Sequence, residues 1–286
     1  MAINKENDTN PHCSPYRYLY IYLINGLVNA DDEMHLGENF LGNWVDDGCS
    51  FLFFSRSAID IVNKLLGLRL DLELIEDHRF TYEQWQGGSF ETMQIDNFLI
   101  SSPWANVDAA EDTKHISLDP GVVFGNGLHP TTRDCVRAID LAYAYRPFKR
   151  VLDLGTGTGI LAIAAALMGA KDVMCVDINP LCVKTAINNV RLNGLSEVVN
   201  VKKGSSDDYA NMQADLVVAN IHYEVIKRFL TKRQFNKGDL LILSGLLRSQ
   251  ARDVEAQLKM LGFRIIRKMD YEMTWFTFYI VFSRTL

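Results

Sequence analysis

The sequence predicts an α/β protein: a Rossmann-like sheet of seven strands with helices on both faces, preceded by a small α+β domain. Three observations carry this prediction. From Lys149 onward, apolar strand-like runs alternate with helical patterns, which is typical of a parallel sheet covered on both faces. A glycine-rich loop joins the first of these strands to its helix. The net charge also changes sign between the two parts of the chain.

This charge is distributed unevenly. The 286 residues hold 29 Lys+Arg and 35 Asp+Glu, a net charge of −6, and their 48% apolar and 22% charged residues are ordinary for a globular protein. Residues 1–115 carry a net charge of −12, whereas residues 116–286 carry +6. The split indicates two units with different roles, although two solvated surfaces that attract each other would also produce it. The acidic total argues against direct nucleic-acid binding.

Several classes of protein are excluded. The longest apolar run of the second half, Ile160–Met168, falls far short of the about 18 residues that a membrane span needs. The five cysteines are odd in number and include no Cys-x-x-Cys pair, which argues against a disulfide framework and a zinc site. We therefore expect reduced thiols, no metal, no membrane contact and a cytoplasmic location. The oligomeric state stays open.

The N-terminal part, residues 1–80, is predicted to be a small α+β domain after a disordered tail of about 14 residues. A helix is expected over Ala58–Leu66, because its apolar residues share one helical face, with Ser57 as cap and Gly67 as stop. Strands are expected at Tyr16–Ile24, Cys49–Ser55 and Leu70–Ile75.

Residues 81–115 are predicted to be a connector with some structure of its own. Gly87, Gly88 and Pro103 interrupt any long element there. A short strand is expected over Phe98–Ile100.

The third part, residues 116–286, is predicted to hold the seven-stranded sheet. Its helices are expected at Thr131–Ala142, Ile160–Met168, Pro180–Asn193, Tyr223–Lys232 and Ser249–Leu261. Its strands are expected at Arg150–Leu154, Asp172–Asp177, Val198–Lys202, Asp215–Ala219, Leu240–Ser244, Phe263–Met269 and Trp275–Phe282. The late residues Met269, Met273, Trp275 and Phe276 are interpreted as core and sheet packing.

The glycine loop contains Gly155, Gly157 and Gly159 between a buried strand and a helix. Such a loop lets the backbone approach a ligand and points amide groups at it. Asp177 ends the next strand, where an acid can bind both hydroxyls of a ribose. A nucleoside-containing cofactor explains the combination better than a glycine turn beside an incidental acid.

The spacing of the glycines and the position of Asp153 indicate which cofactor the loop binds. Dinucleotide sites have G-x-G-x-x-G, whereas this loop has G-x-G-x-G with Asp153 two residues before it. A carboxylate there is unfavourable beside a diphosphate and favourable beside the ammonium group of S-adenosylmethionine. The sequence therefore favours S-adenosylmethionine, with an NAD-dependent oxidoreductase as the alternative.

Several motifs together resemble the methyltransferases that modify ribosomal protein eleven of the large subunit, the PrmA family. The resemblance is good over residues 82–286 and weak before them. Besides the glycine loop, the matching segments are Leu118–Thr132 with its Phe-Gly-x-Gly-x-His-x-Thr-Thr pattern, Val176–Pro180, Ala219–Ile221 and Leu243–Leu247. The resemblance implies a class I methyltransferase fold with S-adenosylmethionine as cofactor.

The resemblance also implies roles for single residues. Thr132, Gly155, Asp177 and Asn220 match positions that contact the cofactor in the family, and Asn220 is expected to orient the acceptor amine. Phe124, Gly125 and Gly127 are expected to belong to a loop that folds over the cofactor. His129 is expected to cap or orient this loop, with a role as catalytic base as the alternative. Ser205 and Asp207 are candidate adenine contacts, for which a solvated loop is the simpler interpretation.

The acceptor is less defined than the cofactor. His222 and Tyr223 are expected to line the acceptor pocket, where the family usually has small apolar residues, and Asn126 stands where Thr is usual. The resemblance implies N-methylation of lysine or other amino groups of a ribosomal protein, a basic partner that the acidic N-terminal part would suit. Another protein lysine, a small molecule, or a noncatalytic cofactor-binding module remain alternatives.

Overall fold

The computed structural model describes residues 17–89, 92–108 and 113–283. These residues form two compact units. The first unit lies within residues 1–92 and 102–108, and the second within residues 93–101 and 109–286. The tail predicted for the first 14 residues lies outside the described residues. No helix of the described ranges is long and apolar enough to cross a membrane.

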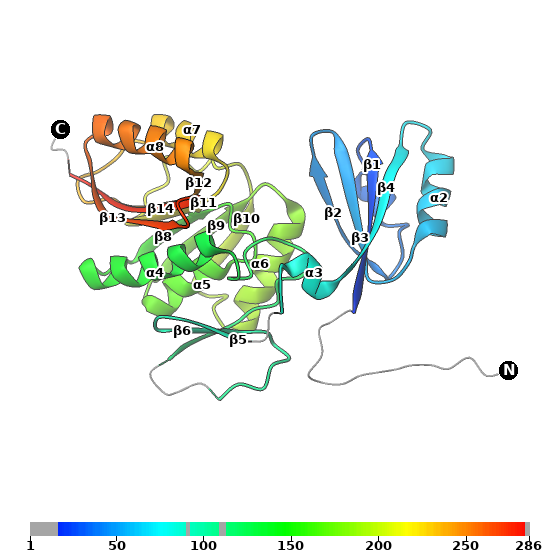
Figure 1. Ribbon diagram of the computed structural model, residues 1–286, viewed down its shortest axis with the longest axis horizontal. Helices are drawn as coiled ribbons and strands as arrows, with labels where there is room; N and C mark the ends of the chain where they lie inside the picture. Colours follow the sequence, from blue (N-terminus) through cyan, green and yellow to red (C-terminus); the bar gives the residue numbers. More distant parts are fainter. Residues whose placement is uncertain (1–16, 90–91, 109–112, 284–286) are drawn as a thin grey trace. The chain divides into compact units, whose positions relative to one another are not determined.

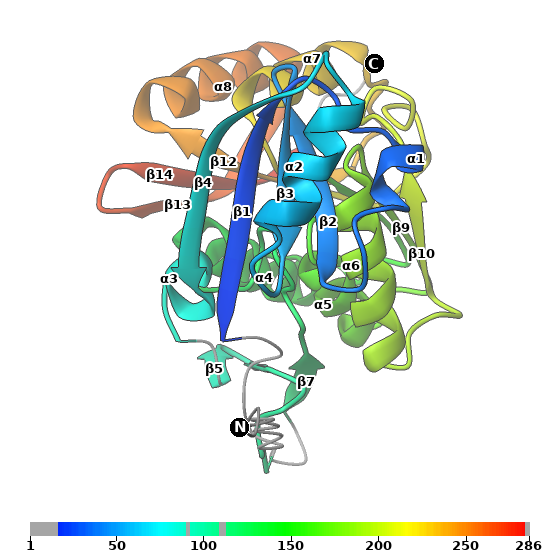
Figure 2. The ribbon, with the colours of Figure 1, turned by 90° about the vertical axis from the view of Figure 1, so that its right-hand side faces the viewer.

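The first unit is a four-stranded antiparallel sheet in the order β2-β3-β1-β4, and helix α2 lies across one face of it (Figure 2). Tyr22 of β1 and Phe54 of β3 are buried beneath α2 in one apolar cluster with Val62 and Leu65. The elements are β1 (Tyr18–Asn25), α1 (Ala30–Glu33), β2 (Phe40–Asp46), β3 (Cys49–Phe54), α2 (Ile59–Leu68), β4 (Glu73–Thr81) and α3 (Tyr82–Gln86).

Two sequence expectations for this unit were wrong, and one strand was missed. The helix has Ala58 rather than Ser57 as its N-cap, and it continues through Gly67 to Leu68. The expected strand Leu70–Ile75 begins only at Glu73 and runs to Thr81, because pairing with β1 carries it through a charged, exposed stretch. Strand β2 was not expected, since Gly42 and Asn43 weaken its strand pattern.

The second unit contains the predicted seven-stranded sheet, which confirms the expected fold class. The strand order is β10-β9-β8-β11-β12-β14-β13, and the first five strands are parallel. Strands β14 and β13 complete the sheet as an antiparallel pair. The strands are β8 (Arg150–Leu154), β9 (Asp172–Asp177), β10 (Val199–Lys203), β11 (Leu216–Asn220), β12 (Leu240–Leu247), β13 (Phe263–Tyr271) and β14 (Trp275–Phe282).

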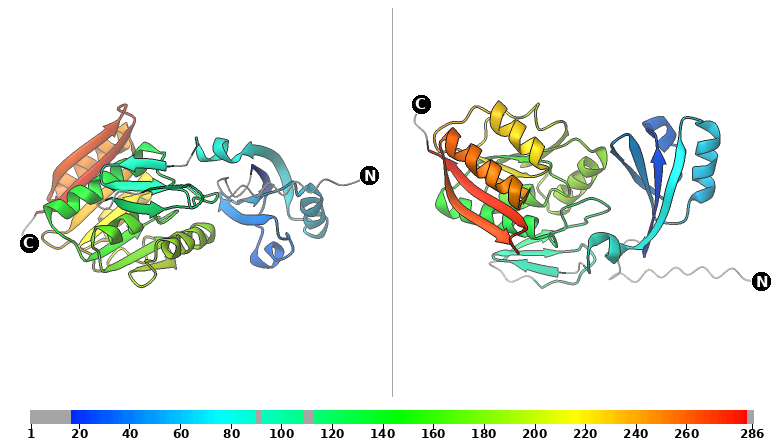
Figure 3. Two further views of the ribbon diagram at one scale, coloured as in Figure 1. Left: turned by 90° about the horizontal axis from the view of Figure 1, so that it is seen from below. Right: turned by 45° about the horizontal axis from the view of Figure 1, so that its top comes forward.

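Helices cover both faces of this sheet. One face carries α4, α5 and α6, and the opposite face carries α7 and α8, drawn in yellow and orange (Figures 1 and 3). Strands β8 and β11 are almost wholly buried between the two layers, as their continuous apolar runs require. The helices are α4 (Pro130–Tyr145), α5 (Ile160–Met168), α6 (Pro180–Leu192), α7 (Tyr223–Lys232) and α8 (Arg248–Leu261).

A small three-stranded sheet of β5 (Thr92–Ile95), β6 (Phe98–Ser101) and β7 (Lys114–Ser117) precedes α4. Strand β6 corresponds to the short strand expected over Phe98–Ile100. The side chain of Asn97 donates to both carboxylate oxygens of Asp140 (3.1 and 3.0 Å), which fixes the β5–β6 turn to α4. Strand β7 leads into residues 119–129, the segment that precedes α4.

Candidate functional site

The chemistry-bearing residues gather where parallel strands end. The glycine loop follows β8, Asp177 ends β9, Asn220 ends β11, and Gly245 lies near the end of β12. Open α/β sheets bind ligands at this carboxyl edge of their strands. The fold therefore brings together residues that are far apart in the sequence.

The glycine loop has a backbone that only glycine adopts without strain. Gly155, Gly157 and Gly159 have φ angles of +70°, +56° and +85°. A Cβ atom on Gly155 would lie 2.1 Å from Cγ2 of Ile221, and one on Gly157 would lie 2.6 Å from the carbonyl oxygen of Phe124. The glycines thus let the loop fit closely between two other segments of the site.

Asp177 holds the loop from the next strand. Its Oδ2 accepts the Gly157 N–H (3.0 Å) and its Oδ1 accepts the Asn179 N–H (2.9 Å). Burial raises the pKa of this carboxyl group above its usual value, and these backbone hydrogen bonds oppose the rise. Because each carboxylate oxygen has further lone pairs, Asp177 can still accept two ribose hydroxyls.

Asp153 is the most unusual acid of the site. It is 1% exposed; its Oδ2 accepts the hydroxyl of Thr156 (2.6 Å), whereas its Oδ1 makes no hydrogen bond with the described residues. Burial, together with the negative charge of Asp177, raises the pKa of Asp153 to about 7. The charge of a buried carboxylate is stabilised by a cation nearby, so an ammonium group suits this end of the site better than a phosphate does.

A second segment, residues 119–129, lies against the glycine loop. Thr158 donates its hydroxyl to the carbonyl of Gly125 (2.7 Å). The buried side chain of Asn189 in α6 donates to the carbonyls of Thr158 (2.8 Å) and Asp119 (2.9 Å), and its Oδ1 accepts the Asp119 N–H (2.9 Å). One amide thus fixes both segments. Asn189 was not identified from the sequence, although a polar asparagine on the apolar face of an amphipathic helix can indicate a buried hydrogen-bonding role.

Asn220 and the start of α4 form the third part of the site. The Nδ2 of Asn220 lies 3.2 Å from Oγ1 of Thr131 and 3.5 Å from Oγ1 of Thr132, and both threonines are 1% exposed. The N-cap of α4 is His129, whose Nδ1 lies 2.7 Å from Oγ1 of Thr131. The Thr131 hydroxyl therefore contacts both Asn220 and the N-cap residue, whereas the Thr132 hydroxyl contacts Asn220.

Two aromatic rings lie beside His129 of this group. The His129 ring centroid lies 5.3 Å from that of Phe124 and 5.1 Å from that of Trp275, both edge-on. Phe124 is 49% exposed, so its ring is accessible to a ligand. Burial lowers the pKa of His129, which favours the neutral imidazole. Sequence analysis assigned Trp275 to packing, because nothing in its spacing linked it to His129.

Gly245 approaches Asn220 from β12. Its φ is +81°, and a Cβ atom there would lie 2.9 Å from the carbonyl oxygen of Ile221 and 3.2 Å from Oδ1 of Asn220. Between Leu243 and Leu246 the register of β12 shifts against β14. This irregularity places backbone directly beside the side-chain oxygen of Asn220.

The other predicted residues have partners outside this group. The hydroxyl of Tyr223 donates to Asp253 of α8, and Lys227 Nζ lies 5.0 Å from the centroid of the Tyr223 ring. His222 stands at the N-cap of α7 without a side-chain cap. Asp207 forms an ion pair with Lys232 (2.7 Å), so its carboxylate is directed to α7.

Within residues 17–89, 92–108 and 113–283, no group of three or more His, Cys, Asp and Glu side chains could hold a metal ion. Cys135, Cys175 and Cys182 are buried free thiols, and Cys49 is a partly buried one.

Comparisons with known proteins agree on one family. The family model described as "Ribosomal protein L11 methyltransferase (PrmA)" matches residues 58–282. The ribosomal protein L11 methyltransferase of Geobacillus thermodenitrificans (strain NG80-2) is 38% identical over 186 residues, 64% of this chain and 59% of the relative. That of Heliobacterium modesticaldum (strain ATCC 51547 / Ice1) is 41% identical over 170 residues, 58% of this chain and 53% of the relative.

Among solved structures, the crystal structure of ribosomal protein L11 methylase from Lactobacillus delbrueckii subsp. bulgaricus is similar with a TM-score of 0.60 and 30% identity. The similarity covers 68% of this chain and 100% of that one. The chain spans less than two thirds of the length of the curated relatives that it matches. Residues 1–57 lie outside the match to the family model.

Proposed function

The chain belongs to the ribosomal protein L11 methyltransferase (PrmA) family, and on this premise we propose that it transfers methyl groups from S-adenosylmethionine to amino groups of ribosomal protein L11. The observation that carries the proposal is the buried carboxylate of Asp153 beside the glycine loop. The names of the similar relatives support the acceptor.

The residues of the site fit this cofactor. Asp153 would bind its ammonium group, Asp177 its ribose hydroxyls, and the backbone at Gly155 and Gly157 would lie along it. Phe124, together with Gly125 and Gly127 of the same segment, would cover it and exclude water. The negative diphosphate of NAD would be repelled by the carboxylate of Asp153, which argues against NAD as the cofactor.

When bound, S-adenosylmethionine supplies a methyl group on a sulfonium centre, which an uncharged amine attacks in line. The contribution of the chain is alignment. Asn220 is fixed through Thr131 and Thr132, so its side-chain oxygen can accept a hydrogen bond from the attacking amine. A lysine ammonium must lose its proton first, and removal from water favours that loss. His129 would hold the start of α4 in place, and in its neutral form it can also accept this proton.

The acceptor is proposed to be a basic protein, which suits the acidic first part of the chain. Another protein lysine or a small molecule remains the alternative acceptor, because His222 and Tyr223 depart from the family pattern. A cytoplasmic location and the absence of nucleic-acid and membrane contacts stay predictions.

A thermal-shift measurement tests the cofactor assignment. S-adenosylmethionine and S-adenosylhomocysteine should each raise the melting temperature by several degrees at about 100-fold excess over their dissociation constants, whereas NAD should not. Stabilisation by NAD alone would instead identify a dinucleotide-binding protein. Stabilisation by S-adenosylmethionine without methyl transfer to any protein extract would favour a noncatalytic binding module.

A further inference from the structure

The hairpin of β13 and β14 ends in a turn whose backbone does not suit its residues. The central residues of the turn, Glu272 and Met273, have φ angles of +50° and +52°, and the Thr274 N–H donates to the carbonyl of Tyr271 (2.9 Å). Positive φ at both central residues is the mark of a type I′ turn, which prefers asparagine or aspartate followed by glycine. Glutamate and methionine are strained in this conformation, because the Cβ atom crowds the backbone.

The same chain uses the preferred residues in another hairpin. Strands β2 and β3 are joined through Asp47 and Gly48, with φ angles of +44° and +78°. Within the described ranges, the other non-glycine residues with positive φ are Asp47 and Asp96, and aspartate tolerates this region. Glu272 and Met273 thus stand out. Strain that is kept at an exposed turn indicates that the side chains themselves have a use.

Hydrogen bonds hold the strained turn in one conformation. The Met273 N–H donates to Oδ1 of Asp270 (3.0 Å), and the hydroxyl of Thr274 donates to the carbonyl of Glu272 (3.2 Å). The Nη2 of Arg248, the first residue of α8, lies 3.7 Å from Sδ of Met273. Figure 2 shows the two strands in red, with the turn projecting past α8. The turn is therefore ordered before any partner binds, which lowers the entropic cost of association.

A row of side chains connects the turn to the candidate site. Leu247, Trp275 and Tyr271 lie opposite one another on the neighbouring strands β12, β14 and β13. Because opposite residues of paired strands point to the same face of a sheet, their three side chains lie side by side. The ring centroid of Trp275 lies 5.1 Å from that of His129, the N-cap of α4. The row therefore runs from the site to the turn.

The row and the turn expose apolar side chains among acids. Leu247 is 40% exposed, Tyr271 48% and Met273 61%. Asp270 and Glu272, which flank them, are exposed too. Single exposed apolar residues are common, but a group of them that begins beside a reaction centre indicates a contact surface. The acids favour a partner that carries basic groups.

We propose that the turn of the β13–β14 hairpin contacts the segment of the protein acceptor that flanks the methylated amino group, with Met273 as the apolar contact and Glu272 as the charged one. This inference rests on the proposed function, which supplies the acceptor. A turn of the preferred sequence would lack both side chains, so the contacts that they make explain why the strain is kept. Both residues then determine specificity, whereas alignment of the amine belongs to Asn220.

The test gives the turn its preferred sequence in the full chain, through Glu272→Asn with Met273→Gly. This double variant removes the strain and both side chains together, so a loss of acceptor binding cannot be attributed to poorer folding. The matched control is Met260→Ala, because Met260 is 75% exposed on the same unit but lies at the opposite end of α8 from Arg248. For each protein we would measure the melting temperature, the KM and kcat for methylation of recombinant ribosomal protein L11, and the KM for S-adenosylmethionine.

The double variant should melt about 2–4 °C above the unchanged protein, because glycine and asparagine adopt the turn with less strain. Its KM for L11 should nevertheless rise about tenfold, the size expected when a methionine side chain no longer becomes buried. Its kcat and its KM for S-adenosylmethionine should not change. The control should stay within about twofold of the unchanged protein in every kinetic measurement.

Four outcomes would overturn the inference. Methylation of L11 with an unchanged KM in the double variant would reject the turn as a contact and leave the proposed function intact. A lower melting temperature of the double variant would show that the turn is not strained. A dimer of the unchanged protein that becomes a monomer in the double variant, in analytical ultracentrifugation, would assign the turn to a second copy of the chain. No methylation of L11 by the unchanged protein would reject the proposed function together with the inference.

Discussion

Asp153 is the residue on which the choice of cofactor depends. Its pKa of about 7 arises mainly from burial, so its ionised form is unfavourable until a cation lies beside it. Since this value lies above the ordinary one, the unfolded chain ionises first as the pH rises. The group therefore stabilises the fold most at low pH, and this contribution is lost between about pH 4 and pH 7.

The same shift predicts a pH dependence of cofactor affinity. If the ionised form of Asp153 binds the ammonium group, affinity for S-adenosylhomocysteine should rise about eightfold from about pH 6 to about pH 7.5 and then level off. Calorimetric titration at several pH values checks this. In Asp153→Asn the affinity for S-adenosylhomocysteine should be weaker and should no longer depend on pH in this range. If the affinity of the variant rises with pH as steeply as that of the unchanged protein, another group causes the dependence.

The sequence was sufficient to identify residues that stand at strand ends. Asp153, Asp177 and Asn220 follow apolar runs, and parallel strands bring such positions to one edge of the sheet. Trp275 and Asn189 could not be identified in this way. They enter the site from an antiparallel strand and from the last turn of a helix, through contacts that only the folded chain creates.

At the scale of elements, the C-terminal end of α6 holds residues 117–119 and the glycine loop in place through side-chain hydrogen bonds. The side chain of Asn189 accepts the Asp119 N–H and donates to the Asp119 carbonyl, and Asn193, one turn later, pairs with the backbone of Ser117 in the same way (2.9 and 2.7 Å). Only Asn189 also reaches the glycine loop, through the carbonyl of Thr158. The two asparagines therefore share a structural role but differ in their connection to the site.

Replacing these asparagines should separate stability from cofactor binding. Asn189→Ala leaves buried backbone groups without partners and should lower the free energy of unfolding by about 2–4 kcal/mol, as measured by urea denaturation. It should also raise the KM for S-adenosylmethionine. Asn193→Ala should destabilise the fold by a smaller amount and leave that KM unchanged. Equal effects of both variants on the KM would refute a specific link to the glycine loop.

Elements were predictable where the local pattern and the tertiary environment agree. Ile160–Met168 and Asp172–Asp177 have the predicted bounds, because an apolar helix and an apolar strand are buried there. Strand β4 was misplaced, because its middle is charged and exposed at the edge of a sheet. Only its pairing with β1 makes that stretch a strand.

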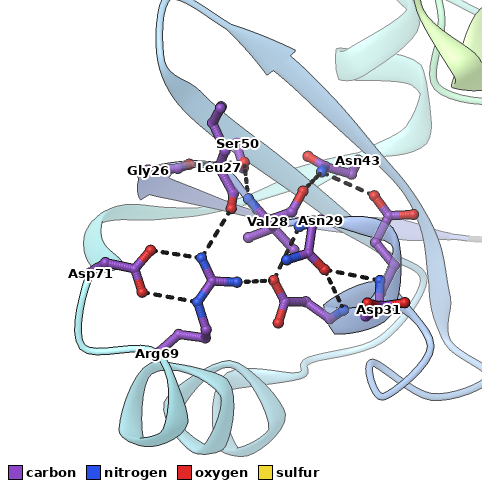
Figure 4. A network of polar contacts seen from close by, with 11 residues as sticks. Gly26, Leu27, Val28, Asn29, Asp31, Asn43, Ser50, Arg69 and Asp71 are labelled. Carbon is purple, nitrogen blue, oxygen red and sulfur yellow. Dashed lines mark hydrogen bonds and ion pairs between the residues drawn. The ribbon is translucent and has the colours of Figure 1, made fainter.

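At the scale of the whole molecule, the division of charge receives a structural interpretation. Some acids of the first unit have partners inside that unit: Asp32 pairs with Arg69, and Glu33 accepts the side chain of Asn43 (Figure 4). Asp31, Asp46 and Asp47 are among the exposed acids that are available to a basic partner. The net charge of −12 for residues 1–115 therefore overstates the negative charge that is available to bind a partner.

Neutralising the exposed acids should slow association with the acceptor. Asp31→Asn, Asp46→Asn and Asp47→Asn combined should lower the association rate with L11 several-fold at low salt and have little effect at high salt, because rim charges act mainly by steering. Asparagine also suits the positive φ of Asp47 (+44°). Stopped-flow measurements at two salt concentrations check this, and a salt-independent rate change would point to altered folding.

The most direct test of the account is the transfer of labelled methyl groups from S-adenosylmethionine to recombinant ribosomal protein L11, with the modified residues located by mass spectrometry. The account predicts incorporation at amino groups by the unchanged chain, and a loss of about 100-fold in rate for Asn220→Ala, which removes the group that aligns the amine. If the chain binds the cofactor but incorporates no label into L11, the proposed acceptor is contradicted.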